Sequence, residues 1–132
     1  MQTRLTAGLY FGAMAHILLA GKDWQARALL RAQLIEEGLE VEAHESVADA
    51  AASLESQTPP PELLLADISM SDDPAGDVET LAARTKRVPI WVIASPSLIA
   101  QGILKGRGFE MILFRPVDVG ELVEQIKRRT EG

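Results

Sequence analysis

The chain has 132 residues, enough for one domain that builds its own hydrophobic core. It has no cysteine, which excludes disulfides and thiolate metal sites and fits a reducing, cytoplasmic location. A formal charge of -6 argues against direct nucleic-acid binding through a general basic surface, and no apolar run reaches the ~18 residues that a membrane span needs.

Residues 9–20 form a largely apolar stretch that follows Arg4 and faintly resembles a signal peptide. His16 interrupts this stretch, and its second half is needed for the first strand of the domain. We therefore expect residues 1–14 to be a leader or an added tail outside the fold, and residues 15–132 to form the domain.

Strand and helix signals then alternate five times along the chain. Short runs rich in apolar residues predict strands at 16–20, 39–43, 63–67, 90–94 and 111–114. Capping residues, glycines and prolines bound the expected helices. Four of them run from the cap Asp23 to Gly38, from the cap Ser46 to about Ser56, from about Asp77 to Lys86, and from Ser97 to Lys105. The last helix follows the turn at Arg115-Pro116 and ends at about Arg129.

Five strand–helix units of this length predict an α/β fold, a doubly wound parallel sheet with helices on both faces. Periodicity alone leaves the order of the strands open. The third strand is an apolar run that ends in Asp67, at the carboxyl edge of the sheet. Because ligands of open α/β sheets bind at this edge, Asp67 is the leading candidate for a functional residue.

From residue 16 to residue 129 the sequence resembles a response-regulator receiver domain. The resemblance rests on the ordered segments ILLAGKDWQAR, RALLRAQLIEEGLEVEAHESVADAAASL, PELLLADISM, VPIWVIAS and the run from Gly108 to Pro116 that ends in FRP. It implies a flavodoxin-like fold with strand order 2-1-3-4-5, and a signalling module rather than an enzyme.

The resemblance also implies which residues form the phosphorylation pocket. In the family, two acids after the first strand hold Mg²⁺ beside a phosphoaccepting Asp, a hydroxyl ends the fourth strand, and a switch aromatic lies three residues before a Lys that precedes a Pro. The phosphoacceptor is retained here as Asp67. The other positions are altered: Gly21 and Lys22 replace the acid pair with Asp23 beside it, Ala94 replaces the hydroxyl with Ser95 one position late, Ile112 replaces the aromatic, Arg115 replaces the Lys, and Ser71 replaces a Pro in the loop after the acceptor.

These replacements predict that the pocket has lost its metal. Mg²⁺ prefers several carboxylate oxygens, whereas Asp67, Lys22 and Arg115 together carry a charge of +1. Each unmatched charge at close range costs about 1–4 kcal/mol, so we expect Mg²⁺ binding to be lost or very weak and autophosphorylation to be very slow. We expect Asp67 to be a structural acid held by Lys22, Arg115 or both.

The sequence therefore favours an atypical receiver domain that regulates a protein partner or an attached effector domain without phosphorylation. We expect the partner, or a second copy in a homodimer, to contact the face of the fourth helix, fifth strand and fifth helix. The apolar residues expected on that face are Leu98, Ile99, Ile103, Leu113 and Val117.

Two alternatives stay open. One is a working receiver that accepts a phosphoryl group on Asp67 from a histidine kinase. The weaker one is a small-anion or nucleotide sensor that uses Lys22 and Arg115 at the sheet edge.

Four further residues carry smaller predictions. His16 and His44 are expected near opposite ends of adjacent strands, which makes a metal site improbable. Trp24 follows the first loop and is expected to cover the altered pocket, whereas Trp91 is expected in the core.

Overall fold

The computed structural model describes residues 14–131. In this part of the chain five strands alternate with five helices, namely β1 (His16–Gly21), α1 (Trp24–Glu36), β2 (Glu40–His44), α2 (Val47–Glu55), β3 (Leu63–Asp67), α3 (Pro74–Ala82), β4 (Ile90–Ala94), α4 (Pro96–Ala100), β5 (Met111–Phe114) and α5 (Val119–Glu131). The predicted leader at 1–14 lies, apart from Met14, outside the described residues.

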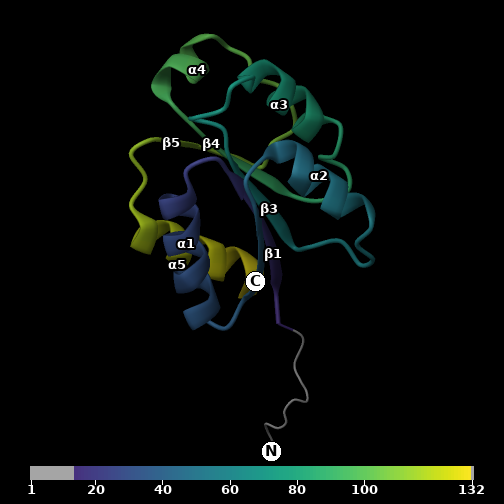
Figure 1. The fold of residues 1–132 in the computed structure, drawn as a ribbon, viewed down its shortest axis with the longest axis vertical. Coiled ribbons are helices and arrows are strands. Elements are labelled where there is room, and N and C mark those ends of the chain that lie inside the picture. The colour runs from purple at the N-terminus through teal and green to yellow at the C-terminus, as the bar shows by residue number, and fades with distance from the viewer. Residues whose placement is uncertain (1–13, 132) are drawn as a thin grey trace, which may run out of the picture.

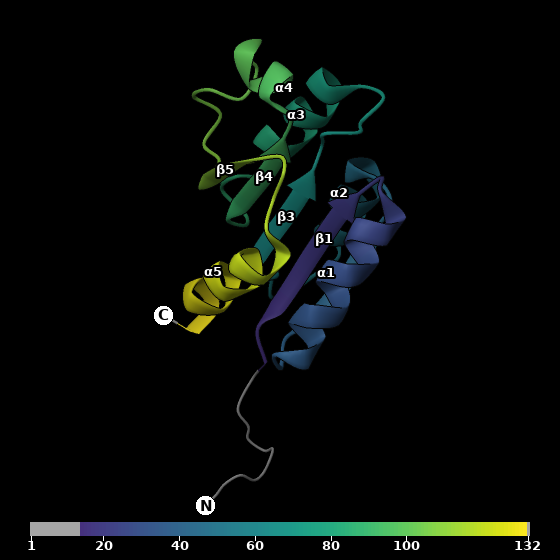
Figure 2. The ribbon, with the colours of Figure 1, turned by 90° about the vertical axis from the view of Figure 1, so that its left-hand side faces the viewer.

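All neighbouring strands pair in parallel, in the order β2-β1-β3-β4-β5. This confirms the doubly wound sheet and the strand order that the resemblance implied. Figure 1 shows α1 and α5 together on one face of the sheet and α2 and α3 on the other. In the turned view, α1 and α5 lie in front of β1 and β3, and α2 lies behind them (Figure 2).

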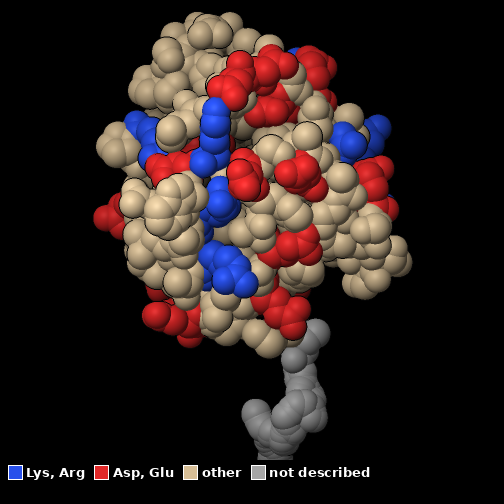
Figure 3. Space-filling model, in the orientation of Figure 1, with Lys and Arg blue, Asp and Glu red and all other residues tan. Residues whose placement is uncertain are grey.

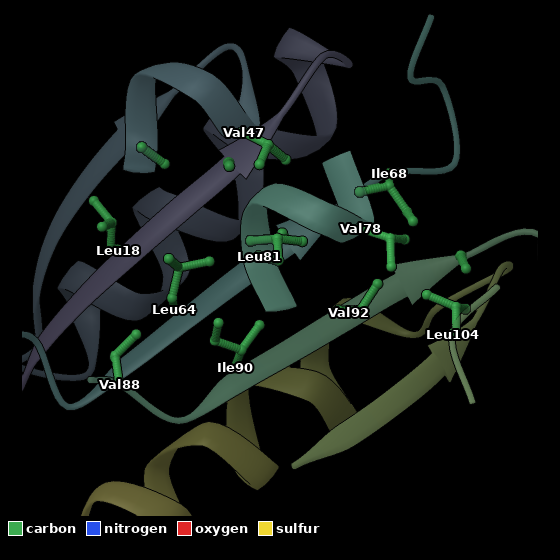
Figure 4. Packing of buried hydrophobic residues seen from close by; sticks show 14 of the residues in the cluster. Leu18, Val47, Leu64, Ile68, Val78, Leu81, Val88, Ile90, Val92 and Leu104 are labelled. Atoms are coloured by element: carbon green, nitrogen blue, oxygen red, sulfur yellow. The ribbon is translucent and has the colours of Figure 1, made fainter. Parts of the chain in front are cut away.

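The core has two halves because successive side chains of a strand point to opposite faces of the sheet. Toward α2 and α3, helix residues such as Val47, Val78 and Leu81 cover strand residues such as Leu64 and Ile90 (Figure 4). Toward α1 and α5, the buried strand residues are Ile17, Leu19, Leu63, Leu65, Trp91 and Ile93. The burial of Trp91, which is 2% exposed, confirms its predicted place in the core.

Helices α1 and α2 begin at the predicted capping residues. Asp23 Oδ1 accepts hydrogen bonds from the backbone N–H groups of Gln25 and Ala26, at 3.1 and 3.2 Å. Ser46 Oγ accepts one from the N–H of Asp49 at 3.0 Å. The end of α1 is followed by Gly38, whose φ of +90° lies in the left-handed region that favours glycine.

Two helices differ from prediction. Helix α3 begins at Pro74 rather than near Asp77, because Asp73 caps it and proline suits the first turn, and it ends at Ala82 rather than Lys86. Helix α4 stops at Ala100 instead of reaching Lys105. Gly102 and Gly106 both have positive φ, and turns follow α4 where its second half was expected.

None of the helices between residues 14 and 131 is long and apolar enough to cross a membrane.

Candidate functional site

Asp67 closes β3 at the carboxyl edge of the sheet, between Gly21 at the end of β1 and Ile93 near the end of β4. Its side chain is 18% exposed. A Cβ atom added to Gly21 would lie 3.4 Å from the Asp67 Cβ, which is an ordinary contact between paired strands. The sheet register thus places the Asp67 carboxyl group beside the ends of β1 and β4.

Both carboxylate oxygens of Asp67 have protein partners. Oδ1 accepts hydrogen bonds from the Ser69 backbone N–H at 3.0 Å and from the Ser69 hydroxyl at 2.6 Å. Oδ2 lies 2.5 Å from Arg115 Nη2 in an ion pair. The predicted pairing of Asp67 with Arg115 is therefore confirmed.

Sequence reasoning missed the role of Ser69. A residue two positions after an aspartate is well placed to donate to its carboxylate in an Asx turn, so the Asp67-Ile68-Ser69 spacing carried that signal. The Ser69 hydroxyl also donates a hydrogen bond to Asp67 Oδ1, the oxygen that accepts from the Ser69 backbone N–H.

The prediction named Lys22, Arg115 or both as partners of Asp67, and of these two only Arg115 is paired with it in the structure. Lys22 Nζ bonds Asp72 Oδ2 at 2.7 Å, with both side chains largely exposed. The acid that binds this lysine thus comes from the polar loop after β3. Asp67 and Arg115 therefore form a neutral pair, rather than part of a cluster with a charge of +1.

Ala94 and Ile112 stand at the positions where the receiver family has a hydroxyl and a switch aromatic. Neither residue has the side chain that moves in the family's switch. Ala94 is fully buried, and its carbonyl oxygen accepts a hydrogen bond from the Arg115 N–H at 3.0 Å. Ser95 caps α4, with its Oγ 3.0 Å from the Ser97 hydroxyl, so it has a local structural role. Ile112 packs against the core on the α2–α3 side.

The side chains at this edge of the sheet do not supply the oxygen ligands that Mg²⁺ prefers. Gly21 and Lys22 offer no carboxylate, Asp23 uses Oδ1 to cap α1, and Asp67 Oδ2 faces a guanidinium group. Within residues 14–131, no three acidic or histidine side chains are grouped so that they could hold a metal ion.

One smaller prediction has a clear outcome. His16 pairs with Glu40 at the start of β2, and His44 pairs with Ala20 near the end of β1, so the histidines lie at opposite ends of adjacent strands as predicted. Trp24 is 65% exposed, and its role as a cover of the altered pocket stays a prediction.

A pocket of about 80 Å³ opens beside Asp67 on the α1–α5 side of the sheet. Sequence reasoning missed Arg27, which lines this pocket and donates from Nη1 to the Gly21 carbonyl oxygen at 2.5 Å. The wall is otherwise mainly apolar, and the lining residues also include Asp23, Asp67 and Arg115.

Of the residues predicted for the interaction face, four are partly buried and pack against the core, namely Ile99, Ile103, Leu113 and Val117, and the fifth differs from expectation. Leu98 is only 6% exposed and belongs to the core, so it does not offer a contact surface. The exposed apolar side chain on this face is Phe114, at 60%. It borders a shallow hollow of about 140 Å³ that includes Leu113, Val117, Asp118 and Glu121.

The charge pattern of the surface is mixed. On the face drawn in Figure 3, Lys and Arg side chains form a narrow column with acidic side chains beside it, rather than a broad basic patch.

Comparison with solved structures finds many similar folds. The chain matches a receiver domain protein from Methanospirillum hungatei JF-1 with a TM-score of 0.75 at 21% identity, over 90% of this chain and 95% of that one. A receiver protein from Pseudomonas putida matches with a TM-score of 0.73 at 20% identity, over 89% and 99% of the two chains.

A match to a longer chain covers only its receiver-sized part. A probable two-component system response regulator/GGDEF domain protein matches with a TM-score of 0.71 at 24% identity, over 89% of this chain and 49% of that one. No family model and no curated protein matches the sequence. With its sheet order, its helices on both faces and these structural matches, the chain has the fold of a CheY-like response-regulator receiver domain.

Proposed function

We propose that this domain is a phosphorylation-independent regulatory module that acts through contact with a protein partner or an attached effector domain. The observation that carries the proposal is the state of Asp67, whose two carboxylate oxygens are held by Ser69 and Arg115. A phosphoacceptor needs a free oxygen and a metal ion beside it, and neither fits this arrangement.

Arg115 links the parts of the fold that a metal and a phosphoryl group connect in the family. Its side chain binds Asp67 at the end of β3, and its backbone N–H binds Ala94 at the end of β4. A planar guanidinium group suits such a carboxylate contact better than a lysine does. The pair therefore holds the loops at the sheet edge in one arrangement without a bound ligand.

The partner surface that we propose is the face of α4, β5 and α5. Its features are the exposed Phe114 ring and the adjacent hollow, whose rim carries Asp118 and Glu121. Exposed aromatic side chains are frequent anchors of protein interfaces. If the partner is a second copy, sedimentation should show a concentration-dependent dimer that Phe114→Glu disrupts.

The phosphorylation-independent part of the proposal is tested with a small acyl phosphate and Mg²⁺. The protein is incubated with both, and intact mass spectrometry followed by peptide mapping measures phosphoryl addition at Asp67. We expect no adduct on the wild-type domain. A stable adduct at Asp67 would contradict the proposal and favour the alternative of a working receiver, which the partial exposure of Asp67 leaves chemically accessible.

A restored variant provides the positive control. It carries Gly21→Asp, Lys22→Asp, Ala94→Thr and Arg115→Lys, which return the family pattern to the pocket. A Cβ at position 21 is sterically acceptable because it would lie 3.4 Å from the nearest Asp67 atom, an ordinary contact. Circular dichroism establishes that the variant is folded, and an adduct on this variant alone supports the proposal.

A further inference from the structure

The outer face of α1 is apolar, in contrast to that of α5 on the same side of the sheet. The exposed apolar residues of α1 are Trp24, Ala28, Leu29, Ala32 and Ile35. Within residues 14–131, α1 supplies three of the six large apolar side chains that are exposed, at 65%, 50% and 43% for Trp24, Leu29 and Ile35. Apart from Gly120, the exposed residues of α5 are all charged. Helix α5 is therefore built to face water on its outer side, and α1 is not.

Helix α1 is apolar on its inner face as well, where Leu30 and Leu34 are buried against the sheet. A helix that is apolar all round is usually covered on both faces. In the turned view α1 runs along the right-hand margin of the molecule, and no other described element lies over its outer face (Figure 2). The fold thus leaves open a face that has the composition of an interface.

The exposed residues of α1 follow the seven-residue pattern by which two helices pair. The positions at the centre of such a contact, a and d, are filled by Gln25, Ala28, Ala32 and Ile35. The flanking positions, g and e, are filled by Trp24, Leu29, Arg31 and Glu36. Because alanine is small, the two backbones can approach closely at the centre of this contact.

The flanking positions favour a parallel pair of two identical helices. In a parallel pair, a g residue meets the e residue five positions further along the other helix. Arg31 then meets the partner's Glu36, and Trp24 meets the partner's Leu29, once on each side of the contact. An antiparallel pair would instead bring the two Arg31 side chains together.

Arg31 and Glu36 are both available for such a contact. Each side chain is exposed, and neither forms an ion pair with another residue in the described part of the chain. Being five residues apart, they are not neighbours on their own helix, where pairs form at spacings of three or four. The outer face of α1 thus carries two opposite charges that complement a second copy of itself.

We propose that two copies of this chain associate through the outer faces of their α1 helices, in a parallel pair with twofold symmetry. A twofold contact uses the same surface on both copies, as the pairing of Arg31 with the partner's Glu36 requires. Helix α1 has 13 residues and is about 20 Å long, so the contact is smaller than the ~800 Å² per partner of a standard interface, and we expect a Kd on the order of 100 µM.

This contact does not depend on whether the domain is phosphorylated. It also leaves the face of α4, β5 and α5 open, so a dimer through α1 could still engage a partner there. Failure of either proposal would therefore leave the other standing.

Sedimentation equilibrium between about 10 µM and about 1 mM tests the proposal, because this range spans the expected Kd. We expect the average mass to rise from the monomer toward the dimer. Ile35→Glu places a charge at the centre of the contact and should raise the Kd about tenfold or more. Phe114→Glu, an equally drastic change at an exposed apolar residue on the other face, should leave the Kd unchanged.

A charge exchange tests the pairing itself. Arg31→Glu and Glu36→Arg should each raise the Kd about tenfold, because each sets like charges against one another in two places. The double variant should restore the wild-type Kd, and an equimolar mixture of the two single variants should form a mixed dimer. A double variant as weak as the single ones would contradict the pairing of Arg31 with the partner's Glu36.

Cysteine cross-linking tests the direction of the helices. The chain has no cysteine of its own, so Ala28→Cys introduces one thiol, which in a parallel pair faces its own copy. Under mild oxidation we expect a disulfide-linked dimer of Ala28→Cys and none of Ala52→Cys, an exposed position on α2. Thermal unfolding establishes beforehand that each variant is folded.

Three results would overturn the proposal. The first is a mass that stays at that of the monomer up to about 1 mM, well above the expected Kd. The second is a dimer that folded Ile35→Glu leaves intact or that Phe114→Glu disrupts, because the contact then lies elsewhere. The third is equal cross-linking of Ala28→Cys and Ala52→Cys.

Discussion

At the scale of single residues, the Asp67–Arg115 pair is the contact on which the account rests. The two side chains are 18% and 35% exposed, between a surface pair and a buried one. We expect Asp67→Asn to lower the free energy of unfolding by about 2 kcal/mol, because it leaves the guanidinium group without its carboxylate while Ser69 keeps an acceptor. Urea denaturation measures this loss.

A double-mutant cycle with Arg115→Leu separates the pair from its surroundings. Because the two residues are in contact, the double variant should lose less than the two single variants lose together. Strict additivity would mean that the observed pair does not contribute to stability.

The Lys22–Asp72 pair offers a comparison with the same charges in a different setting. Its side chains are 51% and 87% exposed. We expect Asp72→Asn to change the free energy of unfolding by no more than about 0.5 kcal/mol, since water and salt screen exposed pairs. A loss as large as that of Asp67→Asn, measured in the same denaturant series, would contradict this assignment.

A second informative contact involves Trp91 in the core. Its indole N–H donates to Glu110 Oε2 at 2.8 Å, and Arg129 donates to both oxygens of the same carboxylate. We expect Glu110→Ala to cost about 1–3 kcal/mol because it leaves a buried indole donor unpaired, whereas Glu110→Gln keeps an acceptor and costs less. Denaturation gives the stabilities, near-UV circular dichroism reports on the Trp91 environment, and equal losses would contradict the role of the indole bond.

At the scale of elements, the cap of α1 matters because this helix forms part of the pocket. Asp23 Oδ1 satisfies two N–H groups of the first turn. We expect Asp23→Ala to destabilise the domain by about 1 kcal/mol, and Asp23→Ser, another good cap, to recover most of that loss. The thermal midpoints of the three proteins check the order; no difference between Ala and Ser would contradict capping.

The elements also show what sequence patterns predict and what they miss. The buried strands were predictable because runs such as residues 63–67 and 90–94 are apolar and bounded by turn residues. Helix α4 was overpredicted because the apolar residues Ile103 and Leu104 continue the periodic pattern. In the structure these residues pack from turns at Gly102 and Gly106 instead, so tertiary contacts outweigh helical spacing there.

The sequence predicted those contacts of the candidate site that follow from the order of the strands, and it did not predict contacts that depend on loop paths or helix packing. Asp67 and Arg115 meet because the carboxyl ends of parallel strands share one edge, and this follows from the fold. The partner of Lys22 depends on the path of the loop after β3, which places Asp72 within reach. The pocket lined by Arg27 depends on how α1 and α5 pack, and no spacing along the chain encodes that.

At the scale of the whole molecule, stability should fall in acid. Hydrogen bonds from the Ser53 hydroxyl and from His44 lower the pKa of Glu42 below its ordinary value of 4.5. Hydrogen bonds from Arg129 and from the Trp91 indole lower the pKa of Glu110 in the same direction. Since both pKa values are depressed in the folded state, their contribution is complete above about pH 4.5 and is lost as the pH falls through the folded values.

Denaturation midpoints from neutral pH down to about pH 3 measure this loss. The double variant Glu42→Gln, Glu110→Gln should be less stable at neutral pH and show a shallower decline in acid. An equally steep decline in the variant would contradict the assignment to these two groups.

The central claim is that Asp67 is held by protein groups and no longer binds a metal or a phosphoryl group. The most direct test follows the backbone amides of Gly21, Lys22, Asp67 and Ala94 by NMR during titration with millimolar Mg²⁺ and then beryllofluoride, with the restored variant as a positive control. The account predicts no saturable change in the wild-type domain. Saturable shifts centred on Asp67 would contradict it and identify a working phosphorylation pocket.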